Sequence, residues 1–371
     1  MKDQPKVELN PQPSPDSHRL FFLEFLKAIS ITAVVSFHSI FIPSSALNGS
    51  YEILETLFAP LRFCVPVFLT ISIFLFEKQT VESPTEPSAQ LRKALFKKRL
   101  NRLGTPLLFW FAIATGLKII NGNSIIEIIT QIFQGEIFTG AYYFLVVLQL
   151  LWNFVLIRDW IIQEKNIFTT ILIQGVLLLF VYGTISGFFV DEVLNILRFL
   201  ERPLIIYWIG YIALGVYTCQ NFDWIERTSY SLSKTNKVLI LCLTAATMMA
   251  EYKVLTVLLA DNLRPFDYAA FSCLLSVPMM FICFASVSEK SLPPRIVKLT
   301  KILSKYSLGI FCINGILSQI FLSIGTKLFS QASFNLPQIL IIKMTGWIIL
   351  LGLSLILSIF LKRLGLKKMV C

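Results

Sequence analysis

The sequence predicts an all-α protein, a polytopic helix bundle that crosses a membrane about ten times with both termini in the cytoplasm. Hydrophobic residues make up 55% of the 371 residues and charged residues 15%, and the mean hydropathy is +0.71. This balance is typical of integral membrane proteins and excludes an ordinary soluble domain. The apolar residues form runs of about 17 or more, which is long enough for a helix to span the hydrocarbon core.

Ten such runs are spread evenly along the chain, so we predict a single membrane domain over residues 20–361. The expected spans are residues 20–42, 57–77, 104–120, 142–158, 167–187, 202–219, 237–258, 267–287, 305–328 and 338–361. Ile125–Phe133 is also apolar but too short to cross, which indicates an interfacial or re-entrant segment. Residues 1–19 form a polar tail without a signal-peptide cleavage pattern, and residues 362–371 form a basic tail.

The cations between the runs decide the orientation. With the N-terminus inside, 24 Lys and Arg residues fall in cytoplasmic segments and three in external ones. Such an excess is what the positive-inside rule requires of cytoplasmic loops. We therefore predict a multi-pass protein of the plasma (inner) membrane, with the lipid bilayer as its first partner.

Charge and cysteine content exclude several other classes. The net charge of +11 comes from cations spread over many loops, so nothing indicates a nucleic-acid partner. The seven cysteines lie singly without a CxxC pair, which is typical of small core hydrophobes. Two histidines in the whole chain argue against a histidine-based metal site, and we predict neither a metal nor a tightly bound cofactor. The oligomeric state has no signal in the sequence.

The first span carries the most informative pair, Lys27 and His38, eleven residues apart. On a helix the two side chains differ by roughly 20° around the axis and lie roughly 16 Å apart along it. Ionisable groups at membrane depth are costly and by default functional. A neutral imidazole there is suited to general base catalysis; the alternative is a histidine that only bonds a neighbouring helix. No carboxylate lies one turn away, so an orienting partner must come from another helix.

Three arginines at two places in the chain are further candidates for functional residues. Arg99 and Arg102, at i,i+3 directly before a span, share a helix face and are suited to clamp a phosphate. The alternative is a positive-inside anchor. Arg62 opens the second span at a depth similar to that of His38, where it either snorkels or serves a site. Pro66, four residues on, is expected to kink that helix.

Aromatic and acidic residues on the outer side complete the candidate set. Tyr143 opens the fourth span, where aromatic residues belong to the interfacial belt or stack on a sugar ring. The external segments are acidic and include Glu52. We expect Tyr143 and Glu52 to contact a substrate. Asn314 and Gln319 are polar at membrane depth, and most such residues join helices by hydrogen bonds.

These motifs resemble the membrane acyltransferase-3 family, whose members O-acylate sugars, polysaccharides and related cell-surface molecules. The match runs in order over about three hundred residues. Its strongest parts are Leu23, Leu26, Lys27 and His38 in the first span, Val65, Pro66, Phe68 and Ser72 in the second, and Arg99, Arg102 and Pro106 before the third. Weaker echoes are Tyr143–Leu145, Arg202–Gly215 and Ser304–Phe311. The chain departs from the family where Ile73 follows Ser72 and where Asn314 replaces a common late histidine.

The resemblance implies an acyltransferase (for groups other than aminoacyl) that takes an acyl group, with acetyl as the first expectation, from cytoplasmic acyl-CoA. Lys27, Arg99 and Arg102 would bind the nucleotide phosphates, and the pantetheine arm would extend along the first span. His38 would act as general base or carry the acyl group briefly, and Arg62 would stabilise the oxyanion. The acceptor would be a hydroxyl of a glycan or another cell-envelope molecule.

Two other functions are compatible with a polar bundle interior. The chain would be an exporter or flippase of a glycan or lipid-linked sugar if no acyl chemistry occurred, but such a carrier has no need for a cytoplasmic phosphate clamp. A purely structural scaffold leaves the buried cations unexplained.

Overall fold

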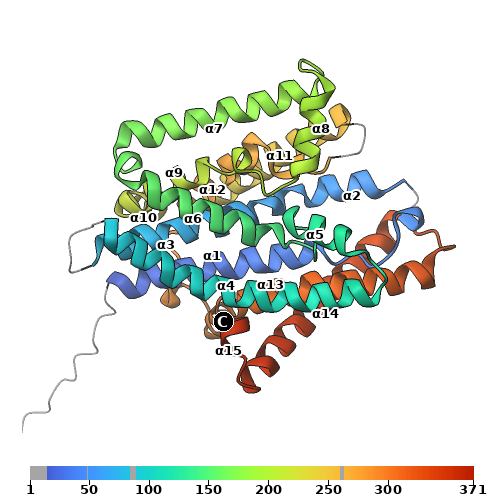
Figure 1. Ribbon diagram of the computed structural model, residues 1–371. Helices are drawn as coiled ribbons and strands as arrows, with labels where there is room; N and C mark the ends of the chain where they lie inside the picture. Colours follow the sequence, from blue (N-terminus) through green and yellow to red (C-terminus); the bar gives the residue numbers. More distant parts are fainter. Residues whose placement is uncertain (1–14, 48, 84–88, 260–262) are drawn as a thin grey trace, which may run out of the picture.

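The computed structural model describes residues 15–47, 49–83, 89–259 and 263–371, and it is a bundle of α-helices. Figure 1 shows the long helices lying side by side, with α7 at one edge, α14 and α15 at the opposite edge and α1 between them. The α-helices are α1 (Pro15–Phe37), α2 (Tyr51–Phe58), α3 (Cys64–Val81), α4 (Ala89–Ile120), α5 (Ile125–Phe133), α6 (Tyr142–Ile161), α7 (Glu164–Ile185), α8 (Asp191–Leu200), α9 (Gly210–Gln220), α10 (Phe222–Ser231), α11 (Lys234–Leu259), α12 (Phe271–Phe284), α13 (Pro294–Phe329), α14 (Leu336–Arg363) and α15 (Lys367–Val370). Short 3-10 turns lie between them: η1 (Ser44–Leu47), η2 (Ala59–Phe63), η3 (Ile205–Tyr207), η4 (Phe266–Tyr268) and η5 (Glu289–Ser291).

Long apolar helices confirm the predicted membrane bundle. Within the described residues, seven helical segments are long and apolar enough to cross: Tyr51–Val81, Gln90–Ile120, Tyr142–Ile161, Glu164–Ile185, Lys234–Leu259, Pro294–Phe329 and Leu336–Arg363. The first predicted span corresponds to α1, which is 23 residues long. The short apolar segment between the third and fourth spans is the nine-residue α5, begun by a Ser124–Glu127 capping box.

Two predicted spans are shorter than expected, and their starts are irregular. The run at 202–219 becomes η3 and the 11-residue α9, and the run at 267–287 becomes η4 and the 14-residue α12. Neither helix alone reaches across about 30 Å of hydrocarbon. Non-helical backbone at membrane depth is tolerated where it is buried in protein or lines a polar cavity. The charged residues that open these two runs meet at such a cavity, described below.

The second span is interrupted rather than kinked at its proline. The helical segment Tyr51–Val81 changes from α2 through the 3-10 turn η2 to α3, and Pro66 lies in the first turn of α3. A proline there lacks only an N–H that would have no partner in the helix. The break places Arg62 in η2, directly before α3.

The basic segment and the C-terminal tail are both joined to the bundle. The cations before the third span continue directly into it, because α4 runs unbroken from Ala89 to Ile120. The C-terminal tail is no free extension, since Val370 is buried and the Trp110 indole donates a hydrogen bond to the Met369 carbonyl at 2.9 Å. Most of the predicted N-terminal tail lies outside the described residues.

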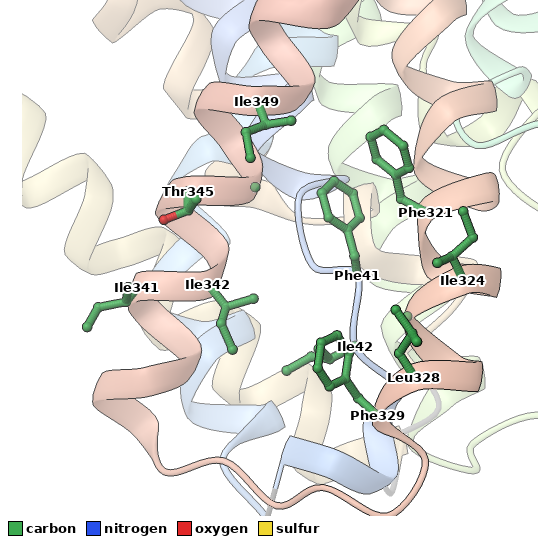
Figure 2. Close-up of a pocket in the computed structure, with 12 residues that line it drawn as sticks. Phe41, Ile42, Phe321, Ile324, Leu328, Phe329, Ile341, Ile342, Thr345 and Ile349 are labelled. Atoms are coloured by element: carbon green, nitrogen blue, oxygen red, sulfur yellow. The ribbon is translucent and has the colours of Figure 1, made fainter.

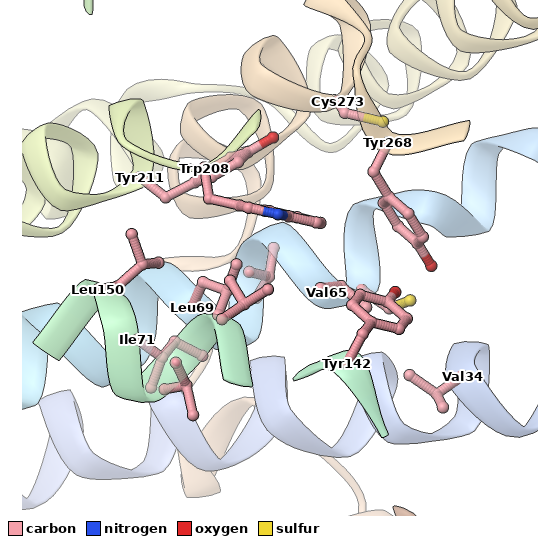
Figure 3. Packing of buried hydrophobic residues seen from close by; sticks show 14 of the residues in the cluster. Val34, Val65, Leu69, Ile71, Tyr142, Leu150, Trp208, Tyr211, Tyr268 and Cys273 are labelled. Atoms are coloured by element: carbon pink, nitrogen blue, oxygen red, sulfur yellow. The ribbon is translucent and has the colours of Figure 1, made fainter. Parts of the chain in front are cut away.

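The apolar core extends through the bundle, and one densely packed part of it lies between α3, α6 and the start of α9. Figure 3 shows Leu69 and Ile71 of α3 facing Leu150 of α6, with Trp208 and Tyr211 covering them from the other side. None of these five side chains is more than 1% exposed. In lipid the packing of such surfaces, rather than their removal from water, stabilises helix association.

Close approaches at glycine hold the segment after α1 between α13 and α14. A methyl group on Gly346 of α14 would lie 2.3 Å from the Ser39 carbonyl oxygen, and one on Gly325 of α13 would overlap the Phe41 carbonyl oxygen. Only glycine permits this distance, so α13 and α14 both pack directly on the backbone that follows His38.

We therefore expect Gly346→Ala to destabilise the protein, because α14 must move away from Ser39. Overpacking of this kind costs about 1–3 kcal/mol. Gly352→Ala on the same helix is the matched control, since nothing lies within 4 Å of its added methyl group. Thermal unfolding of the two purified variants in detergent measures the difference in their stability. Equal unfolding midpoints would contradict the close approach of Gly346 to Ser39.

Candidate active site

His38 directly follows α1 and is held by an asparagine from the opposite end of the sequence. Its Nδ1 lies 2.5 Å from Oδ1 of Asn314, a fully buried residue in the middle of α13. The Asn314 amide nitrogen donates to the carbonyls of Ile310 and Phe311 at 2.8 and 2.7 Å. The amide oxygen therefore faces His38, and Nδ1 must carry the proton that joins them. This tautomer leaves Nε2 as the ring nitrogen that can accept a proton.

His38 lines a polar cavity of about 610 Å³, which we call the His38 cavity. Its wall is assembled from seven parts of the chain that are remote in sequence. The polar side chains that line it are His38, Tyr51, Glu55, Arg62, Thr139, Tyr142, Arg202, Tyr252, Arg264, Asp267 and Tyr268. Polar groups gathered inside a membrane bundle are the usual mark of a substrate or ion site.

Arg62 is the least satisfied of these polar groups. The residue is 6% exposed, and its Nη2 donates to Glu55 Oε2 at 3.0 Å. Its guanidinium lies over the rings of Phe37 and Tyr252, at 5.0 and 4.3 Å from their centroids. Within the described part of the chain, Nε and Nη1 have no hydrogen-bond partner. A buried N–H without a partner is costly, so these two donors are suited to a ligand that carries negative charge.

A second ion pair closes the same cavity. Arg202 binds Asp267 through two hydrogen bonds, Nε to Oδ1 at 2.8 Å and Nη2 to Oδ2 at 3.0 Å. The Arg202 guanidinium also lies 5.2 Å from the centre of the Tyr142 ring. The backbone carbonyl of Arg202 accepts a hydrogen bond from the Trp208 indole at 2.7 Å. Figure 3 shows Tyr142 and Tyr268 side by side at the edge of the apolar core. The paired charges and tyrosine hydroxyls make this wall suited to a hydroxyl-rich ligand.

A buried lysine fixes the end of α1 that carries His38. Lys343 of α14 is 1% exposed, donates to the Ser36 carbonyl at 2.8 Å and lies 4.2 Å from the centre of the Phe58 ring. One turn further along α14, the Trp347 indole donates to the Thr32 carbonyl at 3.0 Å. The Lys343 bond satisfies a carbonyl in the last turn of α1, where intrahelical donors are lacking, and the Trp347 bond adds a second link between α14 and α1.

The three predicted phosphate-binding cations gather beside the middle of α1. Lys27 lies within electrostatic reach of both Arg99 and Arg102, so α1 and α4 bring their cations together. Arg99 is turned toward α3, where it donates to the Ser72 carbonyl and to Gln79 Oε1, both at 3.1 Å. Arg102 is exposed. Arg102 is therefore the most accessible cation of the cluster, and Lys27 and Arg99 are half-buried.

The structure unites the predicted His38 and Arg62 in one cavity but places the two predicted substrate contacts outside its lining. Tyr143 packs between the rings of Phe68 and Phe311, and Glu52 is paired with Lys253. Their sequence neighbours Tyr142 and Glu55 line the cavity instead. Substrate contact by Tyr143 and Glu52 remains a prediction.

The residues that sequence reasoning missed are the partners of the predicted ones. Asn314 was seen as a polar residue at membrane depth, but nothing local links it to His38. Arg202 and Asp267 open two predicted spans with opposite charges, which was the available signal for their pairing. Opposite charges at the outer ends of two apolar runs indicate a pair when a low-dielectric environment makes either one alone costly.

A neighbouring apolar groove has no comparable chemistry. Figure 2 shows Phe41 and Ile42 lying between α14, with Ile341 and Ile342, and α13, with Ile324 and other apolar side chains. The groove has a volume of about 440 Å³, and threonine is the most polar residue type in its lining. Its position on the surface of a membrane bundle suits lipid chains, but it offers no group for acid–base or anion chemistry.

Comparison with known families decides what kind of protein carries this site. The acyltransferase-3 family model, described as an acyltransferase domain, matches residues 20–363. The chain belongs to the acyltransferase-3 family. It is a multi-pass membrane acyltransferase, and the family domain includes His38, Arg62 and the Lys27 cluster. No curated protein and no solved structure matches the chain closely enough to add a relative.

Proposed function

We propose that this acyltransferase moves an acyl group, acetyl in the first instance, from cytoplasmic acyl-CoA to a hydroxyl of a glycan or another cell-envelope acceptor. The plasma (inner) membrane is the compartment that offers both partners. The observation that carries this proposal is the hydrogen bond from His38 Nδ1 to Asn314 in a cavity that also contains Arg62. The His38 cavity then contains a proton acceptor, His38 Nε2, and two N–H donors of Arg62 that have no hydrogen-bond partner among the described residues.

The proposed chemistry uses each group once. His38 Nε2 removes the proton from the acceptor hydroxyl as its oxygen attacks the thioester carbonyl carbon. The Arg62 Nε–H and Nη1–H stabilise the oxyanion that forms. When the tetrahedral intermediate collapses, the carbon–sulfur bond breaks and the imidazolium returns its proton to the thiolate. The products are an oxygen ester and free coenzyme A. Asn314 keeps the ring in the tautomer that starts the cycle.

The donor is proposed to enter from the side of Lys27. A cluster of three cations there is suited to the diphosphate of coenzyme A. Lys27 and His38 are separated by about 16 Å of helix, a distance that the pantetheine arm can cover. The acceptor would contact the Arg202–Asp267 pair and the tyrosines, which offer hydrogen-bond donors and acceptors with a ring face for a sugar.

Membership of an acyltransferase family favours the proposed enzyme over the exporter or flippase that the sequence also allows.

A radiolabelled assay tests the proposal directly. Purified protein in vesicles is supplied with acetyl-labelled acetyl-CoA and an extract of cell-envelope glycans. We expect label in the glycan fraction, released as acetate by mild base because it is held as an ester. Release of coenzyme A without labelled glycan would overturn the glycan acceptor, and transport of a labelled glycan without acyl transfer would favour the carrier.

The role of Asn314 gives a sharper prediction in the same assay. Asn314→Leu removes the acceptor that holds His38 Nδ1–H, so the ring loses its tautomer and orientation. We expect kcat to fall roughly 100-fold or more, with an unchanged KM for the donor. Gln319→Leu is the matched control, an amide-to-leucine change five residues later on α13 and outside the cavity lining. A similar loss in both variants would show that only the packing of α13 matters.

A further inference from the structure

A second groove lies at the end of the bundle that the charge distribution assigns to the cytoplasm. It has a volume of about 700 Å³ and lies between the start of α13 and the end of α14. Its charged lining consists of three lysines and one carboxylate, Lys298, Lys301, Lys305 and Glu289, and we call it the α13 groove. The proposed catalytic steps do not use these residues.

The arrangement of the three lysines is electrostatically unfavourable. They follow one another at i, i+3 and i+7, so they share one face of α13 and repel one another. The positive-inside rule accounts for lysines on this side of the membrane but not for their gathering on one helix face. An anion bound in the α13 groove would relieve the repulsion.

Little of this charge is neutralised by the protein. Lys301 pairs with Glu289 at 2.7 Å, and both side chains are about half exposed. Lys298 and Lys305 have no carboxylate partner within the part of the chain that the structure describes. Lys362 of α14 adds a further cation, because Lys305 and Lys362 lie 5.9 and 5.8 Å from the centre of the Tyr306 ring.

The α13 groove adjoins the Lys27 cluster rather than standing apart from it. The Glu24 carboxylate of α1 interacts electrostatically with Lys27 and with Lys301. The C-terminal helix α15 packs against both α4, which carries Arg99 and Arg102, and α13, which carries the three lysines. The two sets of cations therefore lie on neighbouring elements, and a ligand of moderate length can reach both.

We propose that the α13 groove binds the ribose phosphate of the acyl-CoA donor, while Lys27, Arg99 and Arg102 hold its diphosphate. This inference rests on the proposed function. Coenzyme A carries two separate phosphate centres, and the bundle presents two adjacent cation sets on the same side of the membrane. The ribose phosphate is a monoester with up to two negative charges, and several lysines suit it better than a single one. The lysines thereby select a phosphorylated nucleotide over its dephosphorylated form.

Binding of coenzyme A and of dephospho-coenzyme A, which lacks only the ribose phosphate, tests this assignment. Isothermal titration calorimetry compares the protein in detergent with a variant in which Lys298, Lys301 and Lys305 are all changed to glutamine. We expect the unaltered protein to prefer coenzyme A by about 10-fold to 100-fold, as charged hydrogen bonds to a phosphate provide. The variant should lose this preference and keep its affinity for dephospho-coenzyme A.

The matched control changes Lys93, Lys165 and Lys234 to glutamine, which removes the same charge from exposed cytoplasmic positions outside the groove. It should keep the preference. Equal binding of both nucleotides by the unaltered protein would exclude ribose-phosphate binding in the α13 groove and would leave the proposed function unaffected. Binding of neither nucleotide would exclude acyl-CoA as the donor. An intact preference in the triple variant, with lost binding to phosphatidylglycerol vesicles, would assign the lysines to lipid headgroups instead.

Discussion

Changing His38 to alanine is expected to lower kcat for acyl transfer by roughly 10²–10⁴-fold, the usual contribution of a positioned general base. The imidazole would be the group in the His38 cavity that takes the hydroxyl proton, and Asn314 holds it by a single hydrogen bond. The measurement is the initial rate of label transfer from acetyl-CoA at saturating donor.

His38→Gln serves as the matched control for folding. Its amide keeps a donor for Asn314 but has no basic nitrogen, so it should be as inactive as the alanine variant. Both variants should bind coenzyme A as tightly as the unaltered protein, because the proposed phosphate-binding residue Lys27 lies about three helical turns before His38. Full turnover in either variant at normal protein levels would exclude His38 as the base.

Arg62 gives the second large effect, and two variants separate its structural and catalytic parts. Arg62→Lys keeps a cation beside Glu55 but lacks the Nε–H and Nη1–H donors, so we expect kcat to fall about 10²–10³-fold with modest destabilisation. Arg62→Ala leaves the Glu55 side chain, which is 15% exposed, without its partner. Removing one member of a buried ion pair costs about 3–5 kcal/mol. Thermal unfolding and labelled acyl transfer are measured on each variant.

The double variant Arg62→Met with Glu55→Gln distinguishes the two roles. It removes both charges, so stability should recover relative to Arg62→Ala. Turnover should stay low because the oxyanion donors are still missing. Recovered turnover would show that Arg62 serves only to neutralise Glu55.

Local sequence patterns were sufficient for the architecture but not for the site. Run length and composition predict membrane helices because a helix satisfies its own backbone groups within one segment. The same reasoning predicted Lys27, His38 and Arg62, since an ionisable residue in an apolar run is unusual on its own. It did not predict that α9 and α12 would be short, because the surroundings of their irregular starts are tertiary and include an ion pair between Arg202 and Asp267, 65 positions apart.

The sequence by itself determined the all-α membrane bundle, the acyltransferase-3 resemblance, and the spacing of Lys27 and His38, which lie in α1 and directly after it. The tertiary structure alone decided which residues complete the site. Asn314 lies 276 positions from His38, and their contact exists because α13 packs along α1 and Gly325 of α13 lets it approach the backbone that follows His38. Helical periodicity extends over a few turns, whereas a hydrogen bond between two helices depends on how the whole bundle packs. The partner that sets the His38 tautomer is therefore a property of the fold and not of any local pattern.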